Sequence, residues 1–449
     1  MVLKKEEIIS DLLTRGVADF IDPDGVFRRK LEQKIEGKYP KDIIIKFGID
    51  PTRPDIHLGH AVVFRKLRQF QDIGCKVVFL IGDFTAQIGD PTGKSKARPE
   101  VSIAEVHENL NTYLTQVGKV LKLEENLYDW APNSAWYISV TDYGQGTMAE
   151  KTGQWLEDRK RIINRDSHKR VWTVTLFNLM YTLRTITHAR LIERDLFQDR
   201  LKAGEELYMH EMLYPVLQGV DSAMIYHIFG GCDLEIGGSD QKFNMLMGRD
   251  VMKHQPEPQE PQAVLTTKIL AGTDGKEKMS KSLGNYISIT DAPNDMYGKV
   301  MSIPDTSLVN YFELCTYTPA EEIKAIEAGL AAGKLHPKDT KMRLAREITA
   351  IYHGEKAAAG AEEAFSATFA RGEVPPDLQA VAVSKESLLA DILLREKLVK
   401  SKAEYRRLVE QGAIKNVQSG KRIDDPAHKI TEAAVYRIGS NRFIKVEPQ

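Results

Sequence analysis

Apolar and polar positions alternate along the chain with periods that change from block to block, and the clearest block begins after residue 40. Residues 42–48 form a short apolar run typical of a buried strand, followed by a polar turn that contains proline. Residues 58–71 have helical spacing, and residues 76–81 form a second buried strand. This order predicts a βαβ unit, whose right-handed crossover places the first loop at the carboxyl edge of a parallel sheet. Ligands bind at that edge, so we expect the functional site there.

The same patterns divide the rest of the chain. The pattern of residues 1–40 predicts a helical lead-in broken at residues 22–25, and the fold that contains the βαβ unit is expected over residues 41–317. A mainly helical, charged insertion is expected at about residues 100–210. Residues 318–376 have an alanine-rich helical pattern that ends near Pro375-Pro376, and residues 386–449 form a separate small domain. We therefore expect an α/β protein with a Rossmann-like doubly wound parallel sheet, followed by an α-helical domain and a small α+β domain.

Length and composition agree with this plan. A chain of 449 residues is too long for one compact core, and 42% hydrophobic with 28% charged residues is typical of a soluble globular protein. The first thirty residues mix charged and apolar groups, and no apolar run reaches bilayer-spanning length. We expect a cytoplasmic protein with no membrane partner. Its three cysteines are far apart, so neither a disulfide framework nor a thiolate metal site is indicated.

Charge is distributed unevenly along the chain. Residues 386–446 contain 13 Lys and Arg against 8 Asp and Glu, a surplus of five positive charges. Because the whole chain has a net charge of −1, the remainder carries −6. A basic end on a slightly acidic body favours a nucleic-acid partner, although a surplus of this size is also common on solvated surfaces.

Two short motifs lie about 220 residues apart in the chain. His57-Leu58-Gly59-His60 follows the first strand, and Lys278-Met279-Ser280-Lys281-Ser282 lies in a glycine-rich loop. The first motif places two histidine rings and a glycine, whose backbone a ligand can approach closely, at the start of a helix. The free backbone N–H groups of the first helical turn favour the binding of phosphate groups there. Either motif alone would be interpreted more simply, as a capped helix or a mobile surface loop. Together, in this order and over a βαβ unit, they resemble the two signatures of class I aminoacyl-tRNA synthetases.

Further stretches resemble the tyrosyl-tRNA synthetase family in particular, over most of the chain. Residues around Ser401 to Asp425 are similar to an S4-type RNA-binding domain, in which a helical hairpin on a small sheet presents basic side chains to RNA. The other stretches are 48–52, 85–94, 214–221 and 236–241.

The resemblance implies an ATP site. Adenylation is an in-line attack of a carboxylate on the α-phosphorus, so it needs positioning and positive charge on the leaving pyrophosphate. By resemblance, Thr52 and His57 hold the distal phosphates, His60 the ribose region, and Lys278 and Lys281 close over the pyrophosphate. ATP is expected as a complex with Mg²⁺, with no protein-built metal site and no organic cofactor. The implied ATP-binding set is Gly48, Thr52, His57, Gly59, His60, Gly238, Asp240, Lys278, Ser280, Lys281 and Ser282.

The resemblance also implies an L-tyrosine site. Asp221 matches the partner of the phenol hydroxyl, and Asp90, Tyr214 and Gln218 match the cluster that binds the ammonium group. Tyr214, Gln218 and Asp221 are spaced i, i+4 and i+7, so they share one helix face. Asp240 is expected on the ribose hydroxyls and Gln241 near the substrate carboxyl. The full tyrosine-binding set is Asp50, Thr85, Asp90, Tyr214, Gln218, Asp221 and Gln241.

The implied macromolecular partners are tRNA(Tyr) and a second copy of the chain. The helical domain is expected to bind tRNA, and a homodimer is expected to form through the insertion. The basic residues implied in RNA binding are Lys402, Arg406, Arg407, Lys415, Lys421 and Arg422.

The match departs from the family pattern at Lys46 and Phe47. Many members have Tyr and Cys there, as a second phenol contact and a ribose contact, so neither role transfers to this chain. Three other readings remain open: a tryptophanyl-type synthetase, a synthetase-derived RNA-binding regulator without aminoacylation activity, and an adenylating enzyme that does not use tRNA. The first conflicts with Asp221, and the last leaves the basic tail unexplained.

Overall fold

The computed structural model describes residues 5–51, 56–90, 103–137, 174–257, 259–371, 378, 380–396, 398–399, 401–439 and 442–448. Thr52 and the part of the insertion between residues 138 and 173 lie outside the described residues. The chain divides into two compact units, one formed by Met1–Asp291 with Lys299–Leu344 and the other by Ala292–Gly298 with Ala345–Gln449.

A six-stranded sheet organises the first unit, in the order β1-β6-β5-β2-β3-β4. The predicted βαβ unit is confirmed: β2 runs parallel to β3 from Ile44 opposite Lys76 to Ile49 opposite Ile81, with α3 (Leu58–Asp72) between them. From β2 the chain builds outwards to β3 and β4, and it later returns on the other side of β2 with β5 and β6. The order reverses between β2 and β5, which is where doubly wound sheets bind ligands. The strands are β1 (Val17–Ile21), β2 (Ile44–Ile49), β3 (Lys76–Ile81), β4 (Tyr128–Pro132), β5 (Leu234–Gly238) and β6 (Ala263–Thr267).

The first forty residues contain a strand as well as helices. Between α1 (Lys5–Thr14) and α2 (Val26–Ile35), β1 pairs antiparallel with β6 at the edge of the sheet. Asp19 lies within this strand, and its backbone N–H donates to the hydroxyl of Thr266 at 2.8 Å. The apolar period did not indicate this strand, because it is five residues long, interrupted by a carboxylate and paired with a partner far along the chain.

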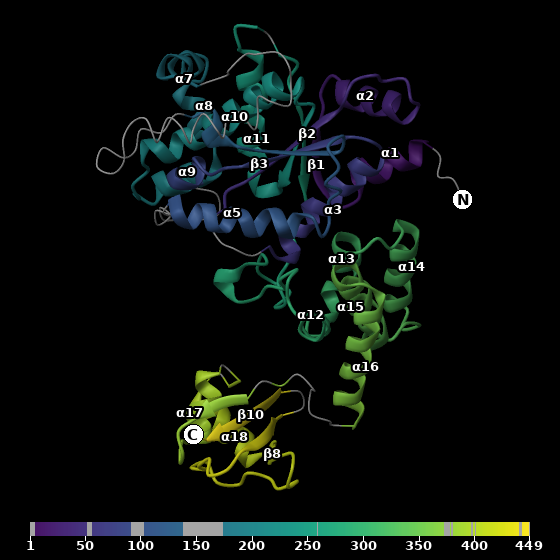
Figure 1. Cartoon of the computed structure of the whole chain (residues 1–449), viewed down its shortest axis with the longest axis vertical. Coiled ribbons are helices and arrows are strands. Elements are labelled where there is room, and N and C mark those ends of the chain that lie inside the picture. Colours follow the sequence, from purple (N-terminus) through teal and green to yellow (C-terminus); the bar gives the residue numbers. More distant parts are fainter. Residues whose placement is uncertain are drawn as a thin grey trace. The chain divides into compact units, whose positions relative to one another are not determined.

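Helices cover both faces of the sheet (Figure 1). α10 (Met209–Phe229) and α11 (Lys242–Lys253) pack together on one face, over a buried cluster that includes Val78, Leu80 and Val216. A Cβ on Gly219 would lie 2.8 Å from the Val251 side chain, so glycine allows the close approach of these two helices. On the other face lie α3 and α5 (Ile103–Val117).

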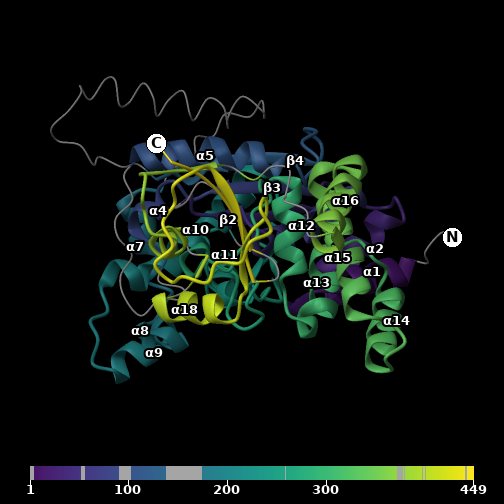
Figure 2. The ribbon, with the colours of Figure 1, turned by 90° about the horizontal axis from the view of Figure 1, so that it is seen from below.

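Short helices belonging to the insertion and the loops complete the first unit. Figure 2 shows α8 (His188–Ile192) and α9 (Asp195–Lys202) next to each other in the described part of the insertion. The other short elements are α4 (Thr85–Ile88), η1 (Asn133–Ala135), α7 (Leu176–Leu183), η2 (Ser239–Gln241), η3 (Lys281–Leu283) and η4 (Asp305–Ser307).

Helices follow the sheet in sequence. The alanine-rich pattern after residue 318 is helical as predicted, as α14 (Ala320–Ala331), α15 (Pro337–His353) and α16 (Glu355–Arg371). Two helices precede them, α12 (Pro293–Met301) and α13 (Leu308–Cys315).

The C-terminal residues form a four-stranded sheet in the order β7-β10-β9-β8. This sheet and two helices share a buried core that includes Leu389, Leu393, Val409 and Ile438. β7 pairs parallel with β10, so the sheet takes in residues before 386. The elements are β7 (Ala380–Val383), α17 (Leu389–Arg395), α18 (Lys402–Glu410), β8 (Ile414–Asn416), β9 (Ala434–Ile438) and β10 (Arg442–Pro448).

Candidate active site

Backbone pairing brings the two sequence motifs together. The N–H of Leu58 donates to the carbonyl of Ile287 at 2.9 Å, and the N–H of Ile289 donates to Ile56 at 3.1 Å. His57 forms a β-bridge with Ser288. The segment between β2 and α3 is therefore tied to the chain that follows the Lys-Met-Ser-Lys-Ser loop, although these segments are more than two hundred residues apart.

The two histidines form a compact pair at the start of α3. Their ring centroids are 3.9 Å apart, and the backbone N–H of His57 donates to Nδ1 of His60. A Cβ on Gly59 would lie 3.0 Å from the His57 ring, so a side chain there would push this ring aside. Burial, together with the nearby lysines, lowers the pKa of His57 to about 2 and that of His60 to about 4. Both rings are therefore neutral near pH 7 and carry no positive charge there.

Asn285 organises the lysine loop from within. Its side-chain oxygen accepts the N–H of Ser280 at 2.8 Å, and its amide nitrogen donates to Asp274 at 2.7 Å and to the carbonyl of Lys278 at 3.3 Å. Met279 is buried, which anchors the middle of the motif. Asn285 was not among the predicted site residues; it lies three positions beyond the motif, where the sequence pattern carries no signal of its own.

The lysines of this loop face charged and aromatic groups. Lys278 forms an ion pair with Asp240, the residue expected at the ribose hydroxyls. The ammonium of Lys281 lies 5.7 Å from the centre of the Tyr286 ring. A Cβ on Gly238 would lie 2.6 Å from a carboxylate oxygen of Asp240, so glycine leaves the space that this carboxylate occupies. A Cβ on Gly48 would make only ordinary contacts, and the side chain of Ser282 lies outside the described residues.

Residues that follow β2 and β3 meet at the carboxyl edge of the sheet. Thr85 donates to one carboxylate oxygen of Asp50 at 2.8 Å, and the hydroxyl of Tyr214 donates to the other at 2.7 Å. A Cβ on Gly82 would lie 2.0 Å from Asp50 and 2.4 Å from Thr85. Only glycine at this position lets the two side chains meet.

Asp90 faces two partners from different elements. The side-chain amide of Gln241 donates to one of its oxygens at 2.7 Å. The guanidinium of Arg194 lies 3.7 Å from the other and 5.1 Å from the centre of the Phe197 ring. Burial lowers the pKa of Arg194 while Asp90 opposes that shift. Arg194 lies in the insertion and was not among the predicted residues.

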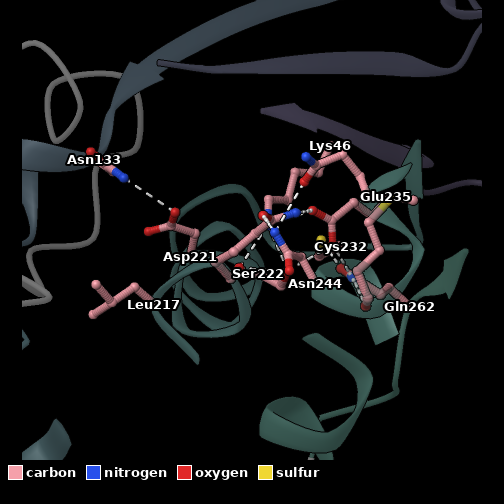
Figure 3. A network of polar contacts seen from close by, with 12 residues as sticks. Lys46, Asn133, Leu217, Asp221, Ser222, Cys232, Glu235, Asn244 and Gln262 are labelled. Carbon is pink, nitrogen blue, oxygen red and sulfur yellow. Dashed lines mark hydrogen bonds and ion pairs between the residues drawn. The ribbon is translucent and has the colours of Figure 1, made fainter. Parts of the chain in front are cut away.

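Asp221 is fully buried on the helix face predicted to bind tyrosine. Its carboxylate accepts hydrogen bonds from a residue in η1 and from the residue directly after η1. The indole N–H of Trp136 donates to one carboxylate oxygen at 2.8 Å, and the amide of Asn133 donates to the other at 3.2 Å. Figure 3 shows Asn133 directed at this carboxylate. Asn133 also donates to the Thr85 hydroxyl at 3.0 Å, which links the two parts of the site. Burial raises the pKa of Asp221 to about 6, and the strongest opposing effect is the positive charge of Lys46.

Tyr214, Gln218 and Asp221 share one face of α10, as the spacing predicted. Gln218 donates to Glu235 at 3.0 Å and accepts from the amide of Asn244 at 3.1 Å. The structure thus brings together the predicted side chains that follow β2, β3 and β5 and those on α10. Thr52, which lies outside the described residues, is the exception.

The six basic residues predicted for RNA binding are all exposed, on one helix and one hairpin. α18 carries Arg406 and Arg407, and Lys415 forms a β-bridge with Arg422. Lys402 forms an ion pair with Asp391 at 2.8 Å. The N–H of Asn416 donates to the carbonyl of Lys421, which closes the hairpin and places its basic residues near one another.

Within the described ranges no group of three or more His, Cys, Asp or Glu side chains is placed to hold a metal ion. Among the helices that the structure describes, none has the length and apolar character needed to cross a membrane.

Comparisons with known proteins agree with this fold. A family model described as tRNA synthetases class I (W and Y) matches residues 38–370. A mitochondrial tyrosyl-tRNA synthetase from Aspergillus nidulans has a similar fold, with a TM-score of 0.59 and 21% identity over 81% of this chain and 94% of that one. A tyrosyl-tRNA synthetase from Archaeoglobus fulgidus, solved with L-tyrosine, has a TM-score of 0.54 and 20% identity over 80% and 100%. The class is therefore that of the tryptophanyl and tyrosyl synthetases.

Curated relatives narrow the class. The tyrosine–tRNA ligase of Moorella thermoacetica is 40% identical over 97% of this chain and 94% of its own length. That of Thermotoga maritima is 38% identical over 97% and 96%. The chain belongs to the tyrosine–tRNA ligase family.

Proposed function

We propose that this chain activates L-tyrosine with ATP and transfers it to the 3′-terminal ribose of tRNA(Tyr). The observation that carries the proposal is the meeting of two sets of side chains at the switch point of the sheet. The paired histidines and the lysine loop suit a nucleotide, and the cluster around Asp50, Asp90 and Asp221 suits an amino acid with a phenol. The names of the curated relatives support the same reaction.

In the first step the tyrosine carboxylate attacks the α-phosphorus of ATP and pyrophosphate leaves. Negative charge grows on the pyrophosphate, and Lys278 and Lys281 are the cations available in the loop. Lys278 would leave Asp240 for the phosphates, which frees that carboxylate for the ribose hydroxyls. Neutral His57 and His60 would position phosphate and ribose by hydrogen bonds. Mg²⁺ would enter with ATP as part of the substrate complex.

Selection of tyrosine would depend on Asp221. Its carboxylate is held by Trp136 and Asn133 and is aimed from α10 towards the side chains after β3 and β4. A phenol hydroxyl would donate to it, whereas phenylalanine would leave a buried polar group without that partner. Asp90, Tyr214 and Gln218 would bind the ammonium group.

Transfer to tRNA would use the C-terminal unit and a dimer. The exposed basic side chains on α18 and on the hairpin of residues 414–423 suit RNA phosphates. Apolar side chains on α7 support a dimer formed through the insertion, since Leu176 is 75% exposed and Phe177 is 77% exposed. Both assignments are part of the proposal.

Amino-acid-dependent exchange of labelled pyrophosphate into ATP tests the proposal without tRNA. We expect exchange with tyrosine but not with phenylalanine or tryptophan, and a fall in kcat/KM for tyrosine of roughly a hundredfold in Asp221→Ala, because a hydrogen bond to a buried charge is lost. Preference for tryptophan would favour the tryptophanyl alternative. Absence of exchange with all three amino acids would favour an RNA-binding regulator.

A further inference from the structure

Lys46 lies in the middle of β2 with its side chain fully buried. Its ammonium lies 2.9 Å from a carboxylate oxygen of Glu235 and donates to the carbonyl of Gln218 at 2.9 Å and the hydroxyl of Ser222 at 2.8 Å. An ammonium has three hydrogens to donate. All three have acceptors within the protein, so Lys46 has none left for a substrate phenol.

Glu235 lies in β5, and both oxygens of its carboxylate accept hydrogen bonds within the protein. One oxygen accepts from Lys46 and from the Gln218 amide, and the other accepts from Ser222 and Gln262. A buried ion pair is tolerated only when its remaining hydrogen-bonding capacity is used in this way. Figure 3 shows these side chains gathered between β2, β5, α10 and α11.

The space for the side chains around Lys46 and Glu235 depends on a glycine in α11. A Cβ on Gly248 would lie 2.5 Å from the Gln262 amide and 2.9 Å from the Ser222 hydroxyl. The backbone of α11 therefore approaches the ion pair as closely as the chain permits. The pair is a specific feature of the packing between α10, α11 and the sheet.

A continuous chain of hydrogen bonds leads from this pair to the proposed ammonium site. Gln218 donates to Glu235 at 3.0 Å and accepts from Asn244 at 3.1 Å. Asn244 also donates to Gln241 at 3.1 Å, and Gln241 donates to Asp90 at 2.7 Å. Gln218 and Gln241 each use both ends of their amides in this chain, and the amide nitrogen of Asn244 donates to both of them, so the orientation of one side chain fixes the next. The side-chain oxygen of Asn244 is buried and has no hydrogen-bond partner among the described residues.

We propose that Lys46 and Glu235 are positioning residues for the amino-acid site, which hold Gln218 and, through Asn244 and Gln241, the Asp90 carboxylate in the orientation that binds the tyrosine ammonium. This inference rests on the proposed function. It assigns Lys46 a support role behind α10 and not a contact with the substrate. The positive charge of Lys46 also opposes the rise in the pKa of Asp221 that burial causes.

Three variants and one control test this role. Glu235→Gln keeps the size of the side chain and removes the charge, Asn244→Ala breaks the chain without leaving a charge unpaired, and the double variant Lys46→Met with Glu235→Gln removes both charges. Cys232→Ala is the control, because its thiol donates only to the far end of the network at Gln262. The measurements are the Kd of labelled tyrosine by equilibrium dialysis, the KM values in pyrophosphate exchange, and Tm.

We expect all three variants to bind tyrosine about tenfold more weakly, since a charge-linked hydrogen bond no longer orients the site, with the KM for ATP within twofold of wild type. Cys232→Ala should bind tyrosine as wild type does, whatever its Tm. A tyrosine Kd within twofold of wild type in Asn244→Ala and the double variant, with a lowered Tm, would overturn the inference and leave a purely structural pair. Wild-type protein that neither binds tyrosine nor supports exchange would instead overturn the proposed function.

Discussion

At the scale of single residues, burial decides the ionisation of the groups that matter most. Asp221 is taken out of water, and burial outweighs its hydrogen bonds and the charge of Lys46, so its pKa rises from the ordinary value of 3.8 to about 6. His57 and His60 move in the opposite direction, because burial penalises their charged form and the nearby lysines repel it. The amino-acid and nucleotide halves of the site therefore differ in their response to pH.

This difference predicts separate pH profiles for the two substrates. Above about pH 6 Asp221 is ionised and accepts a hydrogen bond from the phenol hydroxyl; below it, the carboxyl is protonated and the charge-assisted hydrogen bond is lost. We expect the KM for tyrosine to rise as pH falls from 7.5 to 5.5. The KM for ATP should stay flat, because His57 and His60 are neutral throughout that range. Pyrophosphate exchange at a series of pH values measures both constants. A flat KM for tyrosine, or a change in the KM for ATP near pH 6.5, would contradict the assignment.

At the scale of elements, the lysine loop is held by a backbone bridge between Ala271 and Lys278 and by one side chain, that of Asn285. Asn285 joins Ser280, Lys278 and Asp274, and its backbone carbonyl accepts the N–H of Thr273 at 2.9 Å. Gly272 is required beside it, because a Cβ there would lie 2.2 Å from the Asn285 amide. The loop thus has a defined shape before ATP binds.

Removing this side chain should affect turnover more than ATP binding. In Asn285→Ala we expect kcat for exchange to fall roughly tenfold, since the side-chain hydrogen bonds to Ser280, Asp274 and Lys278 that shape the loop are lost, while the KM for ATP changes less than threefold. Leu283→Ala is the matched control in the same loop, because the Leu283 side chain is 57% exposed. An equal effect in both variants, or a change confined to KM, would refute a role for Asn285 in shaping the loop.

At the scale of the whole molecule, the C-terminal sheet has a hydrophobic core of its own. That core includes Val383, Leu389 and Val446, all within the C-terminal segment. Because β7 begins at Ala380 and pairs with β10, a truncation at residue 386 would remove most of the sheet and leave its first strand behind. The better boundary lies before β7.

Deletion of residues 378–449 should therefore separate the two steps of the reaction. We expect tyrosine-dependent pyrophosphate exchange within twofold of wild type and loss of most tRNA charging. The double variant Arg406→Ala with Arg407→Ala should weaken charging less severely and reduce its salt dependence. Unchanged charging after the deletion would exclude the basic tail from tRNA binding; loss of exchange would show that the tail supports the catalytic fold.

Local sequence determined a large part of this protein. The βαβ unit, the helical face of Tyr214, Gln218 and Asp221, and the two nucleotide motifs follow from period and residue type, because these depend on neighbours a few positions apart. Residue type also shows the basic surplus of residues 386–446. The family resemblance then assigned them expected roles, and the comparisons confirmed the family.

Tertiary structure alone decided which distant residues complete the site. Asn133, Trp136 and Arg194 reach Asp221 and Asp90 from segments whose patterns carry no functional signal, and β1 joins the sheet beside a strand about 245 residues later. The role of Lys46 is the clearest case. A lysine in an apolar strand has no partner among its neighbours in sequence. Its role depends on Glu235 and Gln218, and only the packing of α10 against β2 and β5 brings these residues within hydrogen-bonding distance. Such contacts are set by long-range geometry, which local period does not encode.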